Sequence, residues 1–181
     1  MVTPPTSLKE LEARIRSIPG FPKPGIVFRD ITTLLKDPGA LALAADLLAQ
    51  QYANAHIAKV AAIESRGFIL GALLASRLGC GFVPIRKRGK LPARSIAEEY
   101  ALEYGTDAIE IHEDAIDPGE RVLIHDDLLA TGGTAAAACR LVNRLKGEIA
   151  GCAFLIELSF LNGRAKLTPH PVFSLIQYQE E

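Results

Sequence analysis

The residues best suited to chemistry lie in one stretch, residues 121–134, which reads RVLIHDDLLATGGT. An apolar run leads to two adjacent carboxylates, and a loop with two glycines and two threonines follows. Glycines let backbone N–H groups converge without a Cβ in the way, and the start of a helix adds aligned donors and a positive dipole end. The pattern predicts a cradle for one phosphate monoester, formed by Ala130, Thr131, Gly132, Gly133 and Thr134.

The adjacent Asp126 and Asp127 indicate a second ligand group beside the phosphate. Carboxylates accept hydrogen bonds from sugar hydroxyls and are also ligands that Mg²⁺ prefers. A phosphate next to two diol-binding acids is typical of a 5-phosphoribosyl group. The alternative is an ordinary strand-to-helix turn in which the glycines serve geometry and an aspartate caps the helix. The paired acids and threonines favour the ligand site, and neither GxxxxGK[ST] nor GxGxxG occurs in the chain.

Two other segments carry concentrated positive charge. Residues 86–94 contain five cations and no acid, and Gly89 and Pro92 predict a mobile loop there. Such a patch fits a small polyanion such as diphosphate; a solvated loop or a nucleic-acid patch is the alternative, the latter disfavoured because no aromatic residues interleave. Arg66, in the sequence ESRGF after an apolar run, predicts a second anion site. Together these features fit a sugar with phosphate at one end and diphosphate at the other.

The elements that must position these residues alternate along the chain. A capping box at Ser7 and Glu10, with apolar residues at helical spacing, predicts a helix over residues 8–18, and the run 19–25 ends it. Asp37 caps a helix that continues to about residue 52. Further helices are expected at 68–78 and 134–146, and strands at 59–63, 82–85, 109–112, 121–125, 150–158 and 172–177. This alternation predicts an α/β fold with a mostly parallel sheet flanked by helices, whose ligands bind beyond the carboxyl ends of the strands.

Composition limits the remaining classes of protein. The 181 residues (19.5 kDa) suit a single domain over residues 1–181, and the net charge of −1 disfavours a general nucleic-acid binder. Three cysteines without a CxxC pair argue against a disulfide scaffold or a cysteine zinc site. With no signal peptide or membrane span apparent, we expect a cytoplasmic protein that binds neither membrane nor nucleic acid.

Five ordered motifs resemble those of the adenine phosphoribosyltransferase family. They are residues 21–32 (FPKPGIVFRDIT), 65–68 (SRGF), 86–92, 100–105 (YALEYG) and 126–134, the last similar to the phosphoribosyl-diphosphate motif of type I phosphoribosyltransferases. The resemblance spans about residues 8–167. It implies the type I phosphoribosyltransferase fold, a homodimer, and a small hood formed by about residues 1–35 that closes over the base. The implied reaction, a step of purine salvage, makes AMP and diphosphate from adenine and 5-phosphoribosyl 1-diphosphate.

The resemblance also implies roles for residues at the base. The Phe28 ring and Leu128 would sandwich adenine, while backbone groups of Val27 and Arg29 would bond its edge. Glu103 would lie near N7 as the acid/base group. In isolation Val27 and Phe28 could equally be core residues, and Glu103 a solvated strand residue.

At the diphosphate the resemblance implies that Arg66 and Lys87 hold the leaving group and that Arg86 reaches it across a dimer interface. Mg²⁺ would be bound mainly through the sugar diphosphate rather than by a protein metal site. The segment 86–99 would close over the reactants. His125 departs from the family, whose members often carry an aliphatic residue there, and we expect a satisfied, partly buried histidine rather than a catalytic one.

Three other functions stay open on the sequence. The first is a phosphoribosyltransferase for a 6-oxopurine or a pyrimidine. The second is a non-catalytic regulator that senses phosphoribosyl ligands, although residues 1–35 lack a basic helix-turn-helix pattern. The third, a nucleotide-sugar or Mg²⁺-dependent phosphatase, lacks the expected cluster of metal ligands.

Overall fold

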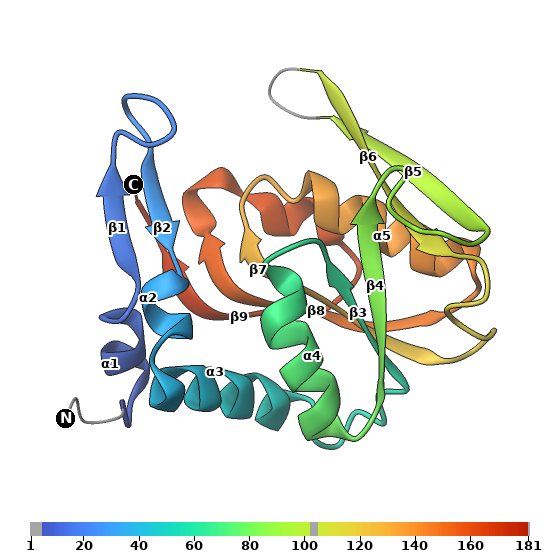
Figure 1. Cartoon of the computed structure of the whole chain (residues 1–181), viewed down its shortest axis with the longest axis horizontal. Helices are drawn as coiled ribbons and strands as arrows, with labels where there is room; N and C mark the ends of the chain where they lie inside the picture. The colour runs from blue at the N-terminus through green and yellow to red at the C-terminus, as the bar shows by residue number, and fades with distance from the viewer. Residues whose placement is uncertain (1–4, 102–104, 181) are drawn as a thin grey trace.

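The computed structural model describes residues 5–101 and 105–180, and a seven-stranded sheet forms its centre (Figure 1). The strand order is β5-β6-β4-β3-β7-β8-β9, with the neighbours from β4 to β9 parallel and β6 antiparallel to both β4 and β5. The strands are β3 (Lys59–Ile63), β4 (Gly81–Lys87), β5 (Ser95–Ala101), β6 (Thr106–His112), β7 (Arg121–Leu129), β8 (Glu148–Leu158) and β9 (Val172–Tyr178). The predicted α/β class and mostly parallel sheet are confirmed.

Helices cover both faces of the sheet. The helices α3 (Pro38–Gln51) and α4 (Gly67–Leu78) share one buried cluster with Leu123 of β7, whereas α5 (Gly133–Arg144) shares the other with Val122 and Ile124. Alternate residues of the same strand thus face opposite helical layers, which explains why the central strands are apolar throughout. Asp37 caps α3 as expected, its carboxylate accepting from the N–H groups of Gly39 (3.0 Å) and Ala40 (3.1 Å).

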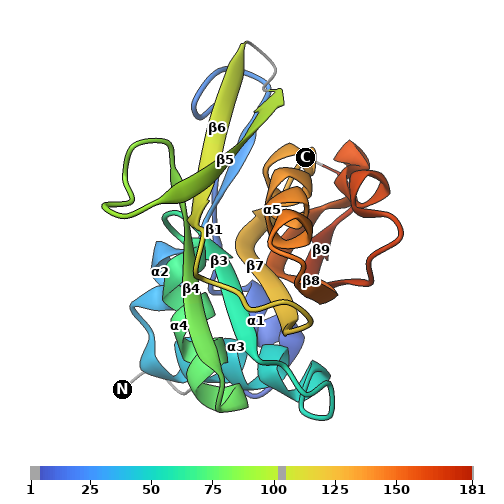
Figure 2. The same cartoon turned by 90° about the vertical axis from the view of Figure 1, so that its right-hand side faces the viewer.

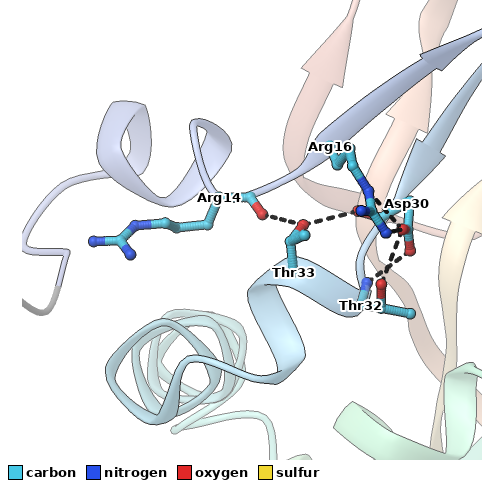
Figure 3. Close-up of polar contacts among 5 residues, drawn as sticks. All are labelled: Arg14, Arg16, Asp30, Thr32 and Thr33. Atoms are coloured by element: carbon cyan, nitrogen blue, oxygen red, sulfur yellow. Dashed lines mark hydrogen bonds and ion pairs between the residues drawn. The ribbon is translucent and has the colours of Figure 1, made fainter. Parts of the chain in front are cut away.

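The predicted helix over residues 8–18 is wrong beyond its first turn. The helix α1 (Leu8–Glu12) ends early, and the chain enters β1 (Arg16–Pro19), which pairs with β2 (Val27–Asp30) and precedes α2 (Thr32–Leu35). Contacts with residues farther along the chain hold residues 14–16 outside the helix that their apolar spacing predicted (Figure 3). The Thr33 hydroxyl donates to the carbonyl of Arg14 (2.6 Å), and Arg16 donates to Asp30 at 2.5 Å. Arg16, together with the N–H and hydroxyl of Thr32, lowers the pKa of Asp30 to about 2, which keeps this junction charged.

The basic segment is not the uninterrupted loop expected over residues 86–94. Arg86 and Lys87 end β4, where they pair with Glu110 and Ile109 of β6. Residues 95–101 form β5, which sequence analysis missed and which makes a projecting arm with β6 (Figure 2). The hydrogen bonds between β4 and β6, together with the carboxylates of Glu64 and Asp107, offset the repulsion between the neighbouring cations Arg86 and Lys87. At its other face the arm is tied to α5, because Arg140 and Arg144 each donate to Glu98 at 2.9 Å.

Two short 3₁₀ helices, η1 (Ser159–Leu161) and η2 (Gly163–Leu167), follow β8. The η2 segment contacts α5, so it lies next to the connection between β7 and α5. Among residues 5–101 and 105–180, no helix has both the length and the apolar character needed to cross a membrane. The hood expected from about residues 1–35 corresponds, where described, to α1, the β1–β2 hairpin and α2; its closure over a base remains a prediction.

Candidate functional site

The phosphate cradle predicted from the sequence surrounds a small cavity. Residues 130–134, here called the phosphate loop, connect β7 to α5 and line a cavity of about 80 Å³ together with Asp126, Leu128, Leu129 and Ala135. The first N–H groups of a helix have no partner within it, so those at the start of α5 are donors for an anion. Gly132 has a φ of +77°, which favours glycine, and a Cβ there would meet the carbonyl oxygen of Gly163 at 2.3 Å.

A larger cavity of about 340 Å³ adjoins the first one. Its walls come from the β3–α4 connection, from Lys87 and Tyr100, and from Asp126, Asp127, Leu128 and Thr134. Arg66 contributes from the connection, and Asp126, Leu128 and Thr134 line both cavities. The structure therefore brings the predicted phosphate and ribose residues together with Arg66 and Lys87 at the carboxyl edge of the sheet, whereas Arg86 lines neither cavity. The β1–β2 hairpin and the β5–β6 arm stand on opposite sides of this edge (Figure 1).

The sequence predicted that the two aspartates follow the strand. They instead form part of it, because β7 continues to Leu129. Asp127 is 4% exposed and its carboxylate accepts from Nε of Arg66 at 2.8 Å. Asp126 lies so close to α4 that a Cβ on Gly67 would approach its Oδ1 to 2.8 Å. Burial raises the pKa of both carboxyls; the neighbouring Asp127 charge adds to the rise at Asp126, whereas Arg66 opposes it at Asp127.

The predicted diphosphate-binding cations are each held by a protein carboxylate. Nζ of Lys87 donates to the Asp107 carboxylate and to the Tyr100 hydroxyl (2.6 Å). Burial alone would lower the pKa of Lys87, but these two hydrogen bonds more than offset it, so the pKa is raised and the amine stays charged. Arg86 donates to Glu64 at 3.2 Å, and the Lys87 backbone N–H donates to the same carboxylate at 2.8 Å.

The hood residues predicted for the base approach the site through Phe28. The guanidinium of Arg66 lies 5.4 Å from the centre of the Phe28 ring, and Phe21 packs edge-on against that ring at 5.3 Å. Leu128 is half-buried and lines both cavities, whereas Val27 pairs with β1. Arg29 turns its side chain away, over the Tyr178 ring at 3.9 Å. The role predicted for its backbone at the base stays a prediction.

Glu103 lies outside the described residues. His125 is fully buried rather than partly buried: its Nδ1 lies 3.0 Å from the carbonyl oxygen of Ala153, while Nε2 has no partner within residues 5–101 and 105–180. The expectation of a satisfied histidine thus applies to Nδ1 alone. Burial lowers the pKa of His125 to about 4, so the ring is neutral and Nδ1 carries the donating proton.

Sequence reasoning missed Glu64, Tyr100, Asp107 and Gly163 as residues of the site. Glu64 stands two positions before Arg66, next to the SRGF motif, but nothing in the sequence pattern shows that its carboxylate pairs with Arg86. Asp107 reaches Lys87 only because β6 folds back beside β5. The close approach of Gly163 to the phosphate loop arises from a segment some thirty residues away, and no local pattern reports such a contact.

Comparison with known proteins agrees with this geometry. The profile of the phosphoribosyl transferase domain matches residues 30–176. The adenine phosphoribosyltransferase of Acidobacterium capsulatum is 56% identical over 170 residues, which cover 94% of each chain. The chain belongs to the adenine phosphoribosyltransferase family. Another family member, from Chloroflexus aurantiacus, is 58% identical over 94% of this chain and 98% of its own.

Solved structures of the adenine phosphoribosyltransferase family have the same fold. That from Thermoanaerobacter pseudethanolicus superposes with a TM-score of 0.93 at 52% identity, covering 95% of this chain and all of its own. The Saccharomyces cerevisiae structure, complexed with D-2,5-dideoxy-2,5-imino-altritol 1,6-bisphosphate and adenine, gives 0.88 at 42% identity, with coverage of 93% and 97%. The family resemblance and the type I phosphoribosyltransferase fold inferred from the five motifs are confirmed.

Proposed function

We propose that this chain transfers the 5-phosphoribosyl group of 5-phosphoribosyl 1-diphosphate to adenine, giving AMP and diphosphate in purine salvage. The observation that carries the proposal is the continuity of the two cavities. Asp126, Leu128 and Thr134 line both the cavity at the phosphate loop and the cavity next to Arg66 and Lys87. A ligand with phosphate at one end, a diol in the middle and diphosphate at the other matches that order of groups. Membership of the adenine phosphoribosyltransferase family supports adenine as the acceptor.

At the sugar, the phosphate loop donates its N–H and hydroxyl groups to the 5-phosphate, and Asp126 and Asp127 accept from the ribose hydroxyls. N9 of adenine forms a bond to the anomeric carbon while the carbon–oxygen bond to diphosphate breaks, inverting the anomer. The electron pair of the broken bond leaves with diphosphate, and the proton of the adenine imidazole ring is transferred to the acid/base group. Positive charge develops on the ribose ring in the transition state, and the carboxyl oxygens of Asp126 and Asp127, which line the cavity, stabilise it.

At the leaving group, Arg66 and Lys87 stabilise the charge that grows on diphosphate. Each would exchange a protein carboxylate for the ligand, since Arg66 is paired with Asp127 and Lys87 with Asp107. The segment 86–99 carries further cations to this end of the site and limits the access of water.

The larger cavity also suits Mg²⁺. The Asp126 and Asp127 carboxylates supply oxygen donors of the type that this ion takes, and no group of three or more metal-ligating side chains occurs within the described ranges. Bound through the sugar diphosphate, the ion would neutralise part of the negative charge of the leaving group.

At the base, adenine lies between Phe28 and Leu128, and backbone groups of Val27 and Arg29 distinguish a 6-amino from a 6-oxo group. Glu103 acts as the acid/base group near N7. We expect Glu103→Leu to lower turnover with adenine while leaving the affinity for the sugar diphosphate nearly unchanged. Unchanged turnover in this variant would remove Glu103 from the mechanism.

The active assembly is a cytoplasmic homodimer. In its support, Ile69 (42% exposed) and Phe82 (37%) are large apolar side chains on the surface of α4 and β4, and Phe82 packs against Phe68 at 5.7 Å. Arg86 lies four residues after Phe82 on the same strand, hence on the same face, which suits a residue that reaches the partner's diphosphate. Sedimentation velocity of the wild-type chain and of Phe82→Ser tests this assembly.

Diphosphate release, measured with each nucleobase in turn and with or without Mg²⁺, tests the function. We expect release with adenine that requires Mg²⁺, and none with hypoxanthine, guanine, uracil or orotate. Release with a 6-oxopurine or a pyrimidine in place of adenine would favour a phosphoribosyltransferase for another base. Tight AMP binding without any release would favour the regulator.

A further inference from the structure

The phosphate loop packs against the backbone of η2 with no side chain between them. A Cβ on Gly163 would lie 2.1 Å from the carbonyl oxygen of Ala130 and 2.9 Å from the backbone nitrogen of Gly132. Conversely, a Cβ on Gly132 would lie 2.3 Å from the carbonyl oxygen of Gly163. Real Cβ atoms do not approach backbone atoms so closely, so each segment fixes the position of the other.

The η2 segment is itself fixed by a forked ion pair. Nε and Nη2 of Arg164 donate to the two oxygens of Glu157 at 3.0 and 2.5 Å, and Nη1 donates to the carbonyl of Val172 at 2.7 Å. Glu157 is only 4% exposed, and it pairs in register with Leu129, the last residue of β7 before the phosphate loop. At the other end of η2, Leu167 is buried in the core beneath α5. The ion pair therefore joins η2 to β8 and β9 directly beside the loop.

We propose that η2, held by Glu157 and Arg164, positions the phosphate loop for the 5-phosphate of the ligand. Glu157, Gly163 and Arg164 are positioning residues, since the loop and not these residues would contact the phosphate. The inference rests on the proposed function of the loop as the 5-phosphate site. Converging N–H donors bind an oxyanion well only when their positions are fixed to within about half an ångström, and a buried support achieves this without ordering the loop on binding.

Gly163 offers a clean test because its backbone does not require glycine. Its φ is not in the left-handed region, so alanine is compatible with the backbone at 163, and the three atoms nearest to an added Cβ all belong to the loop. Gly147, at the opposite end of α5, is a matched control: a Cβ there meets side-chain carbons of Ile116 and Val142 at 2.9 Å, far from the cavities. For the ion pair, Arg164→Met is compared with Arg77→Met, which breaks the Arg77–Asp46 pair (2.7 Å) between α4 and α3.

The experiment measures the affinity of each variant for AMP and for adenosine by isothermal titration. The two ligands differ only in the 5-phosphate, so their ratio isolates the contribution of the loop. We expect Gly163→Ala to weaken AMP binding at least tenfold and Arg164→Met about fivefold, with adenosine affinity unchanged. Arg164→Lys, which keeps the charge but loses the fork, should recover part of the loss. Gly147→Ala and Arg77→Met should bind both ligands like the wild type.

Thr134→Ala separates this inference from the function on which it depends. If Thr134→Ala weakens AMP binding while Gly163→Ala and Arg164→Met stay within twofold of the wild type, the loop binds phosphate but η2 does not position it. If Thr134→Ala also leaves AMP affinity unchanged, the assignment of the loop itself is overturned. A parallel loss of AMP and adenosine affinity in Gly163→Ala would indicate general distortion and would likewise contradict the inference.

Discussion

The two anion-binding sides of the site are built in different ways. On the phosphate side, the loop 130–134 is fixed by backbone packing against Gly163 and by the start of α5. On the diphosphate side, the groups are long side chains, 37% exposed at Arg66 and 41% at Lys87, and both are paired with protein carboxylates. One side is set by steric contacts and the other by electrostatic contacts. The first accepts its ligand group as it stands, whereas the second must exchange partners.

This difference fits the chemistry proposed for each side. The 5-phosphate keeps its charge throughout the reaction, so a fixed cradle suits it. The diphosphate gains negative charge as it leaves, and cations that can move from Asp107 and Asp127 to the ligand suit a changing charge. We therefore expect substitutions on the phosphate side to act through geometry, and those on the diphosphate side to act through charge and to depend on salt.

The largest effect should come from Gly132→Ala. Its φ of +77° and the 2.3 Å approach to the carbonyl oxygen of Gly163 leave no room for a Cβ without moving the loop. We expect kcat/KM for the sugar diphosphate to fall by about 100-fold or more, equivalent to about 3 kcal/mol. Steady-state kinetics at two salt concentrations would check that the loss is independent of ionic strength. A loss below threefold would show that the loop is not held by packing.

A somewhat smaller effect is expected for Lys87→Met. The variant removes the charge and keeps much of the chain length, and a charge-assisted hydrogen bond contributes about 2 kcal/mol, so kcat/KM should fall about 30-fold. Arg77→Met on α4 is the control for a lost surface cation. Here the size of the loss should shrink at high salt, in contrast to Gly132→Ala. Equal losses at both salt concentrations would remove the distinction between the two sides.

His125 provides a test of the scaffold beneath the site. Its pKa of about 4 in the folded protein lies below the ordinary value of 6.5, so the unfolded chain binds the proton more readily. The free energy of unfolding is therefore unaffected by this group above pH 6.5, and it decreases as the pH falls from 6.5 towards 4. We expect His125→Val to remove about 2 kcal/mol of the decline in unfolding free energy between pH 7.5 and 5.

Urea unfolding at these two pH values measures the effect of His125→Val. The variant His56→Asn, at an exposed position, should keep the decline of the wild type. An unchanged decline in His125→Val would show that the ring is not held neutral by burial.

The smallest effect is expected for Asp107→Asn, and its sign is the informative part. Because Asp107 competes with the ligand for Lys87, its neutralisation should tighten binding of the sugar diphosphate by about threefold at low salt. Glu120→Gln, which neutralises the partner of Lys59 at 3.3 Å, is the matched control, since this pair lies at the amino ends of β3 and β7. Weaker binding in Asp107→Asn would mean that the Lys87–Asp107 pair orients the amine instead of competing for it.

The same contrast explains what could be predicted from the sequence. The strand, acids, glycines and helix of residues 121–134 are contiguous, so local reasoning located the phosphate side, although it ended the strand at residue 125 when it continues to Leu129. The diphosphate side depends on β6 folding back beside β4 and β5, which brings Asp107 to Lys87. The N-terminal helix was overextended for a similar reason, since Thr33 and Asp30 hold residues 14–16 from elsewhere in the chain. Contacts between distant segments leave no periodic signal.

A crystal structure of the chain with AMP would show whether the two cavities hold the nucleotide. We expect the 5-phosphate on the N–H groups of residues 130–134, the ribose hydroxyls on Asp126 and Asp127, and adenine between Phe28 and Leu128. AMP bound with its phosphate away from the loop, or with its ribose out of reach of both aspartates, would contradict this expectation.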